Sequence, residues 1–327
     1  MDLFRAAEGF SSVCIAGMCK NAGKTTVLNA FIDAFHAHGA SVAVTSIGRD
    51  GESNDVVFNV AKPEVFLRKG DFAATAKGLL PLCTVSREIL CATGFPTPLG
   101  EVVVFRALSD GFVQIAGPSI VAQLSELKKI FFRLGAGIVF FDGALGRRSL
   151  CSSDVADAAV LASGASLSAN MDFTVEETAF AAKMLGLETC EPLVAARLKN
   201  VKEICCVTDE EILPADGREP LPDGARLLFL PGALTNEHKW LLDAAAAAAV
   251  PAVVESGANV LADRSVAEKF FNQGGRLLQL SAVKLLAVTV NPFSAFGYEY
   301  DALTFERKMR EAVEAPVFNA KNLKVTK

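Results

Sequence analysis

The sequence predicts an α/β protein with a doubly wound, mostly parallel sheet. Short apolar runs alternate with amphipathic helical patterns along most of the 327 residues, as repeated strand–helix–strand units require. Apolar residues make up 51% of the chain, a fraction that suits strands buried on both faces of a sheet. A loop containing glycine and lysine also joins the first predicted strand to the first predicted helix, where such folds place ligand contacts.

The first strand–helix–strand unit covers residues 12–47. Residues 12–16 form an apolar run that is typical of a buried strand. Apolar side chains then recur at helical spacing over residues 27–35, and Gly39 marks the expected end of that helix. A second apolar run follows at 41–47. This order predicts two parallel strands joined by a right-handed crossover.

The next part of the chain departs from this rhythm. Residues 52–117 contain short β-prone pieces, and we expect them to form an elaboration at one edge of the sheet. Within it, runs at 101–108 and 112–116 flank Ser109-Asp110-Gly111, a sequence that predicts a hairpin turn.

The alternation resumes after residue 117. The periodicity predicts helices near 118–134, 174–185, 236–249 and 301–314, and strands near 138–141, 158–161, 202–207, 226–230, 252–255, 276–280 and 286–290. The polar, proline-containing stretch 209–224 is the best internal loop or linker. Because nothing repeats at a fixed period, residues 1–327 are predicted to form a single domain with at most a loosely separable C-terminal half.

Composition excludes several classes of protein. No apolar run reaches the ~18 residues of a membrane span, and the early Asp2 and Glu8 do not fit a signal peptide, so we expect a cytoplasmic protein without a membrane partner. A net charge of −5 without a basic stripe argues against nucleic acid as the main partner. Eight cysteines without a C-x-x-C pair, and only three histidines, argue against zinc or an iron–sulfur cluster. We expect reduced, buried cysteines, except that Cys19 is a candidate reactive thiol.

Residues 17–26 read Gly-Met-Cys-Lys-Asn-Ala-Gly-Lys-Thr-Thr. Phosphate binding needs converging backbone N–H groups, a helix N-terminus, a lysine for the β- and γ-phosphates and a hydroxyl for Mg²⁺. In this pattern Gly23 allows close approach of the backbone, Lys24 supplies the cation and Thr25 supplies the hydroxyl. The sequence therefore predicts a P-loop whose nucleotide contacts come from Asn21, Ala22, Gly23, Lys24, Thr25 and Thr26.

One position departs from the pattern G-x-x-x-x-G-K-[ST]. Its first glycine would fall at position 18, which is methionine, whereas Gly17 lies one residue earlier. We therefore expect the amino-terminal end of the loop to be reshaped. A second lysine, Lys20, lies four residues before Lys24, and we assign it no role.

Two aspartates are candidate magnesium ligands. Asp142 follows the predicted strand 138–141, and Asp50 follows the strand at 41–47. The carboxyl ends of parallel strands meet at one edge of a sheet, so both aspartates are expected near the loop. Either could instead belong to an ordinary turn. The predicted metal ligands are Thr25, Asp50 and Asp142, and the predicted catalytic residues are Lys24, Asp50 and Asp142.

The nucleobase is predicted from weaker signals. The chain contains no N-K-x-D or T-K-x-D motif for guanine, which favours ATP, with Mg²⁺ as its metal. Asn291, in the Asn291-Pro292 pair after the last long strand, is a candidate base contact or part of a simple turn. Arg49, Arg147 and Arg148 could neutralise phosphate charge, or they could belong to solvated loops.

The run 17–26, together with Thr45-Ser46-Ile47-Gly48-Arg49-Asp50-Gly51-Glu52, resembles the P-loop proteins encoded with lysine 5,6-aminomutase and ornithine aminomutase. Further similar pieces lie at 97–101, 142–144, 163–168 and 291–292. This resemblance implies an ATPase that drives release of damaged cobalamin from an adenosylcobalamin-dependent aminomutase. The loop and Asp142-Gly143-Ala144 are also similar to the dethiobiotin synthetase and molybdopterin-guanine dinucleotide biosynthesis group. There Gly23, Lys24 and Thr25 match phosphate and magnesium positions, and Asp50 and Asp142 match acidic positions.

Three functions remain open at this point. The first is the reactivase ATPase with an aminomutase as partner, which we expect to bind the 52–117 elaboration. The second is an ATP-dependent ligase or synthetase of the dethiobiotin synthetase type, acting on a carboxylate metabolite near residues 45–52 and 163–168. The third is a nucleotide-gated scaffold that scarcely hydrolyses, since no glutamine or histidine stands near the motifs to position water. The sequence is compatible with a homo-oligomer.

Overall fold

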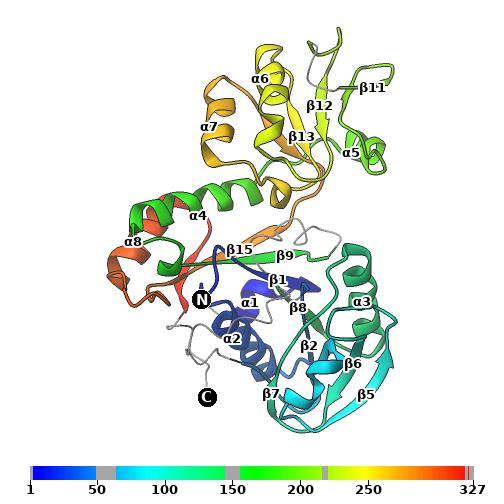
Figure 1. The fold of residues 1–327 in the computed structure, drawn as a ribbon, viewed down its shortest axis with the longest axis vertical. Coiled ribbons are helices and arrows are strands. Elements are labelled where there is room, and N and C mark those ends of the chain that lie inside the picture. The colour runs from blue at the N-terminus through cyan, green and yellow to red at the C-terminus, as the bar shows by residue number, and fades with distance from the viewer. Residues whose placement is uncertain (1–2, 49–63, 144–154, 216–219, 321–322, 324–327) are drawn as a thin grey trace. The chain divides into compact units, whose positions relative to one another are not determined.

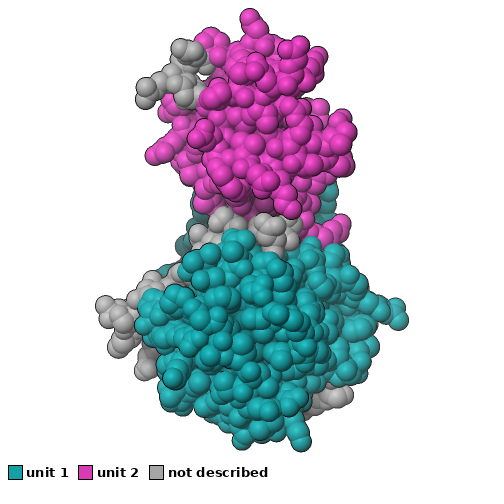
Figure 2. Space-filling model, turned by 90° about the vertical axis from the view of Figure 1, so that its right-hand side faces the viewer, with its two compact units in different colours: residues 1–179, 285–327 teal, residues 180–284 magenta. Residues whose placement is uncertain are grey.

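The computed structural model describes residues 3–48, 64–143, 155–215, 220–320 and 323. The chain divides into two compact units, coloured separately in Figure 2. Unit 1 comprises Met1–Ala179 and Leu285–Lys327, and unit 2 comprises Phe180–Lys284. In the sequence, unit 2 is therefore inserted between the two segments that form unit 1. The stretch 209–224, which we considered as a linker, falls inside unit 2 rather than at a boundary between units.

Unit 1 is an α/β structure built on a large mixed sheet, most of whose strands are parallel (Figure 1). The order across the sheet is β16-β15-β9-β1-β8-β2-β4-β6-β5. Its strands are β1 (Ser12–Gly17), β2 (Val42–Ser46), β4 (Phe72–Ala76), β5 (Arg87–Ala92), β6 (Val102–Ala107), β8 (Ile138–Asp142), β9 (Ala158–Gly164), β15 (Lys284–Asn291) and β16 (Val317–Asn319). Its helices are α1 (Leu3–Ala7), α2 (Lys24–Ala37), α3 (Val121–Arg133), α8 (Ala302–Ala312) and the first part of α4 (Met171–Leu185).

The centre of the sheet is buried on both faces, as the continuous apolar runs predict. Every residue of β1, β2 and β9 is buried, and the three strands and β8 pair in parallel. Side chains that alternate along these strands, such as Val13, Ile15 and Phe140, pack with Phe31 of α2 in one core. α3 contacts β8. This arrangement is compatible with the predicted doubly wound fold.

The elaboration at the sheet edge differs from the expectation. β6 pairs antiparallel with both β4 and β5, whereas β7 (Gly111–Val113) pairs with β3 (Val65–Leu67) in a separate two-stranded sheet. The hairpin predicted around Ser109-Asp110-Gly111 is therefore wrong. The turn residues bind other segments instead: the Ser109 hydroxyl accepts from Ser86 N–H, and the Asp110 carboxylate accepts from Lys69 N–H. The chain thus passes from one sheet to the other at this turn.

Unit 2 is a smaller α/β structure with the strand order β11-β10-β12-β13-β14. Its elements are α5 (Pro192–Leu198), β10 (Cys205–Val207), β11 (Ile212–Pro214), β12 (Leu227–Leu230), α6 (Lys239–Ala247), β13 (Ala252–Val254), α7 (Arg264–Asn272), β14 (Leu277–Gln279) and the end of α4. β12, β13 and β14 are parallel, and β10 and β11 are antiparallel additions. Leu228 packs in a core with residues of α6 and α7, while Phe229 packs in another with residues of α5. Helices therefore cover both faces of this sheet. No described helix is long and apolar enough to cross a membrane.

The start of β1 is fastened to the start of β9 by Asp157. The Oδ2 atom of Asp157 accepts hydrogen bonds from the backbone N–H groups of Ser11 and Ser12, both at 3.0 Å, and from the Ser11 hydroxyl. Lys128 Nζ lies 3.5 Å from Oδ1. Partial burial alone would raise the pKa of Asp157, but the hydrogen bonds from Ser11 and Ser12 and the charge of Lys128 outweigh it and lower that pKa.

We expect Asp157→Asn to lower the free energy of unfolding by about 1–3 kcal/mol, because the hydrogen bonds from Ser11 and Ser12 lose a charged acceptor and Lys128 loses its ionic partner. A depressed carboxylate pKa gives stability that is present above the unfolded-state pKa of about 4 and is lost as the pH falls through the folded-state value. The wild type should therefore lose part of its advantage over the variant below about pH 4. Urea unfolding at pH 7 and at pH 3 measures both effects. Asp172→Asn, which removes an exposed ion pair with Lys308, is the control and should change stability little.

Candidate functional site

Residues 18–23, which we call the glycine loop, leave the carboxyl end of β1 and lead into α2. β1 lies between β8 and β9. The chain first moves to one side of β1, where it forms β2 and then β8, and afterwards crosses to the other side to form β9. In open α/β sheets, ligands bind at the carboxyl ends of the strands beside such a reversal.

The side chain of Lys24 folds back over the end of β1. A methyl group added to Gly17 would lie 2.8 Å from Lys24 Cδ, closer than two carbon atoms that are not bonded approach one another, and 3.0 Å from Lys24 Nζ. Only glycine at position 17 therefore permits this conformation of Lys24. The buried Met18 donates a hydrogen bond from its N–H to the carbonyl oxygen of Ala162, in β9, at 2.7 Å. Gly17, which lies one residue before the position that the pattern requires, thus makes room for the side chain of Lys24.

Two residues of the glycine loop adopt left-handed backbone conformations. Gly23 has φ +93° at the N-cap of α2, and Asn21 has φ +60°. Asn291, at the end of β15, donates a hydrogen bond from Nδ2 to the carbonyl oxygen of Asn21 at 2.8 Å. Gly164, at the end of β9, approaches so closely that an added methyl group would lie 3.2 Å from Cα of Ala22. The ends of β9 and β15 therefore hold the loop in shape.

Asp142 ends β8 in the electrostatic field of Lys24. Its register partners are Ile15 of β1 and Ser46 of β2, which place it at the carboxyl edge beside the glycine loop. Burial raises the pKa of Asp142, and the charge of Lys24 opposes that rise. The Oδ1 atom is buried and has no hydrogen-bond partner among the described residues. A buried carboxylate oxygen without a donor is a suitable ligand for a cation.

The first turn of α2 completes the arrangement. Gly23 provides no side chain to cap the helix, and Lys24, Thr25 and Thr26 form its first turn. Thr25 is half-buried and Thr26 is exposed. The N-terminus of a 14-residue helix, a lysine and a carboxylate thus converge here. Within the described ranges no three His, Cys, Asp or Glu side chains group to hold a metal. Mg²⁺ at nucleotide sites takes only one or two protein carboxylates, so Thr25 and Asp142 suit that ion.

The structure brings together most, but not all, of the predicted site residues. Asn291 contacts Asn21 and lies against Gly23, and Gly164 lies against Ala22 and Asn291. The charge of Lys24 acts on the carboxyl group of Asp142. Asp50, Arg49, Arg147 and Arg148 lie outside the described residues, so their predicted roles stay predictions. The amide of Asn291 holds Asn21 and also accepts from Phe293 N–H, so its visible role is to position the loop. Gly17 and Gly164 were not predicted as parts of the site.

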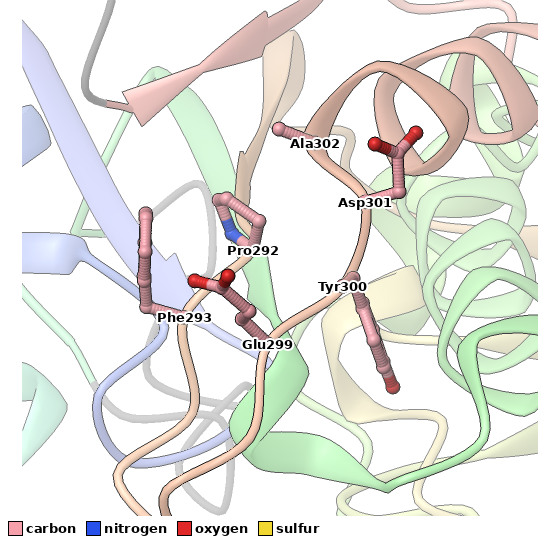
Figure 3. A pocket seen from close by; sticks show the side chains of 6 residues that line it. All are labelled: Pro292, Phe293, Glu299, Tyr300, Asp301 and Ala302. Carbon is pink, nitrogen blue, oxygen red and sulfur yellow. The ribbon is translucent and has the colours of Figure 1, made fainter.

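A pocket of about 430 Å³ adjoins Asn291. It is lined by Pro292, Phe293, Glu299, Tyr300, Asp301 and Ala302 (Figure 3). Phe293 and Glu299 form an antiparallel bridge, so residues 292–300 make a short loop between β15 and α8. The hydroxyl of Tyr298 donates to the carbonyl oxygen of Ala165 at 2.9 Å, which ties this loop to the segment after β9. Apart from Asn291-Pro292, no pattern in the sequence indicated this pocket.

The cysteines differ from the expectation at two positions. Cys19, in the glycine loop, is partly buried, and this burial raises the pKa of its thiol to about 11 against the opposing charge of Lys24. The thiol is therefore protonated at neutral pH, and the idea that Cys19 is reactive is not supported. Cys14, in β1, is disulfide-bonded, so the expectation of reduced cysteines throughout is wrong there.

Comparisons with protein-family models, with curated proteins and with solved structures found no match to this chain.

We expect Cys19 to resist alkylation in the folded protein. With a pKa of about 11, far less than about 1% of the thiol is ionised at pH 7.5, and only the thiolate attacks iodoacetamide. Peptide mass spectrometry after timed labelling at pH 7.5 and pH 9.5 measures its rate, which should rise with pH. The same protein in urea is the control, because unfolding removes the burial that raises the pKa. Equal labelling rates with and without urea at pH 7.5 would contradict the assignment.

Proposed function

We propose that the chain binds a Mg²⁺–nucleoside triphosphate at the glycine loop and hydrolyses it. The observation that supports this most strongly is the return of the Lys24 side chain over Gly17 into the field of Asp142. A lysine held in this way stands at the start of a helix whose N-terminal N–H groups attract anions. On this proposal the segment 17–26 is a P-loop.

The proposed roles follow from the chemistry of each side chain. Backbone N–H groups of Asn21, Ala22, Gly23 and the first turn of α2 would surround the phosphates, and Lys24 would neutralise charge on the β- and γ-phosphates. Thr25 and Asp142 would hold Mg²⁺, with Asp50 as a further candidate ligand. When bound, Mg²⁺ neutralises charge that develops on the transferred phosphoryl group.

The resemblance to the aminomutase-associated proteins supports a more specific proposal. Nucleotide hydrolysis would drive exchange of a damaged cofactor on an adenosylcobalamin-dependent aminomutase. ATP is the nucleotide that the sequence favours. The coupling requires that the nucleotide change the affinity of this chain for its partner, since a ligand shifts an equilibrium only by its differential binding to the two states.

Lys24→Ala should weaken binding of both Mg-ATP and Mg-GTP by about 10- to 100-fold or more, because it removes the cation that pairs with the phosphates. Isothermal titration calorimetry with both nucleotides measures the loss without assuming which base is preferred. Lys20→Ala, an identical change of charge in the same loop, is the matched control and should keep near wild-type affinity.

A second variant separates the position of the lysine from its charge. Gly17→Ala keeps Lys24 but places a methyl group where its side chain lies. Gly17→Ala should also weaken the binding of Mg-ATP and Mg-GTP. Its unfolding midpoint should stay close to that of the Lys20→Ala control. If Lys24→Ala and Gly17→Ala both bind Mg-ATP and Mg-GTP with wild-type affinity, the proposed site is wrong.

Asp142→Asn should keep nucleotide binding in EDTA but lose most of the gain in affinity that Mg²⁺ gives, because a neutral amide is a weaker magnesium ligand than a carboxylate. Its hydrolysis rate should fall at least about tenfold. Mixed with an inactivated adenosylcobalamin-dependent aminomutase, fresh cofactor and nucleotide, the wild type should restore mutase activity and the Asp142 variant should not. Hydrolysis without any restoration would leave the nucleotide site standing and remove the aminomutase from the proposal.

A further inference from the structure

The two units share a short sequence motif at the ends of β9 and β13. Residues 159–167 read Ala-Val-Leu-Ala-Ser-Gly-Ala-Ser-Leu, and residues 252–260 read Ala-Val-Val-Glu-Ser-Gly-Ala-Asn-Val. In both segments a parallel strand ends and a short 3₁₀ helix follows, Ala165–Leu167 in unit 1 and Gly257–Asn259 in unit 2. Ser166 and Asn259 therefore occupy the same position of the motif.

The side-chain oxygens at this shared position differ in their partners. In unit 1, Ser166 Oγ accepts a hydrogen bond from Ala295 N–H at 3.0 Å. In unit 2, Asn259 is only 5% exposed, yet its Oδ1 atom has no hydrogen-bond partner among the described residues. A buried acceptor without a donor costs free energy. Unit 2 thus leaves open an acceptor whose counterpart in unit 1 is satisfied by the backbone.

The neighbours of Asn259 determine which way its amide points. Nδ2 donates to the carbonyl oxygen of Gly232 and to Glu255 Oε2, each at 3.1 Å. Both neighbours are acceptors, so the opposite orientation of the amide would place Oδ1 against two oxygen atoms. The open atom of Asn259 is therefore the oxygen, and it needs a donor.

These oxygen atoms gather at the carboxyl ends of β12 and β13. Leu230 and Val254 end the two strands as register partners, and Gly232 and Glu255 follow closely in the chain. We call Gly232, Glu255 and Asn259 the acceptor cluster. Gly232 is exposed and the Glu255 side chain is 35% exposed, so a ligand can approach from solvent. The carboxyl ends of parallel strands are also where α/β structures bind their ligands.

Lys202 is the cation nearest to the acceptor cluster among the described ion pairs. Its Nζ atom lies 4.0 Å from Glu255 Oε1, and its side chain is 76% exposed. This distance is too long for a hydrogen bond, and exposed ion pairs of this kind are weak. A cation that also donates hydrogen bonds can therefore displace Lys202 from Glu255.

We propose that the acceptor cluster binds the primary ammonium group of a small molecule. Its members offer acceptors only, and Glu255 carries a negative charge, so the ligand needs N–H donors and a positive charge. An ammonium group is compact and has three N–H donors to share among these oxygens. A guanidinium fits less well, because its fork needs both oxygens of one carboxylate and Asn259 already occupies Oε2. The site lies within unit 2 and does not depend on the proposed nucleotide site.

The test titrates the full-length protein with n-butylammonium chloride at constant ionic strength. The side-chain amide signals of Asn259, followed by heteronuclear NMR, should shift saturably. Tetramethylammonium carries the same charge without an N–H donor and should produce no saturable shift. Glu255→Gln should weaken n-butylammonium binding by about 10-fold or more, because it removes the charged acceptor.

Two further variants separate binding from an effect on folding. Lys202→Ala should bind n-butylammonium about two- to fivefold more tightly than the wild type, because it removes the competing cation. Loss of structure cannot produce such a gain. Glu237→Gln removes an exposed carboxylate from the same unit and should leave the affinity unchanged.

Three results would overturn the assignment. The first is the absence of a saturable shift with n-butylammonium. The second is an equal shift with tetramethylammonium or with Ca²⁺, which would mean that charge alone, or a metal ion, explains the response. The third is wild-type affinity for n-butylammonium in Glu255→Gln.

Discussion

The return of Lys24 over Gly17 is the contact on which the candidate site depends. It requires a residue without a side chain at the last position of β1 and a helix that begins at Lys24 itself. The left-handed conformation of Gly23 turns the chain into α2 at that point. The lysine charge then lies near the buried carboxylate of Asp142, which would otherwise be costly to ionise. The charge of Lys24 and the carboxyl group of Asp142 therefore partly offset each other in the free protein.

The glycine loop is held from outside by strands that are distant in sequence. Gly164 of β9 and Asn291 of β15 both contact it, and Ala320, which follows β16, packs against Gly23. These contacts serve different ends: Gly164 permits close packing, whereas Asn291 donates a hydrogen bond to the carbonyl oxygen of Asn21. Preorganisation of this kind matters for an anion site, because backbone N–H groups bind strongly only when no rearrangement is needed to aim them.

Local sequence patterns predicted the centre of the fold and failed at its edges, for identifiable reasons. β1, α2, β2 and β8 have periodic apolar patterns that reflect burial on defined faces, so they could be found in order. The pairing of β6 could not, because Ser109-Asp110-Gly111 is a good turn whose polar groups bind Ser86 and Lys69 rather than closing a hairpin. The contact between Gly17 and Lys24 was missed because the pattern counts four residues between its two glycines, whereas five residues separate Gly17 from Gly23. The pocket at Phe293 and Glu299 had no local signature, since it arises from a bridge between two arms of a loop.

The position of unit 2 in the chain sets a condition on how the site forms. Unit 2 is inserted between α4 and β15, so it separates Gly164 from Asn291 along the sequence. Both residues must nevertheless meet at Ala22 and Asn21 before the glycine loop is supported on that side. Closing a contact across so long a segment carries an entropic cost that grows slowly with its length, and prior folding of the segment reduces that cost. An independently cored unit 2, with its own sheet and helices on both faces, is the kind of insertion that lets the two ends of unit 1 come together. The integrity of the glycine loop is thereby linked to the folding of a unit that contributes no residue to it.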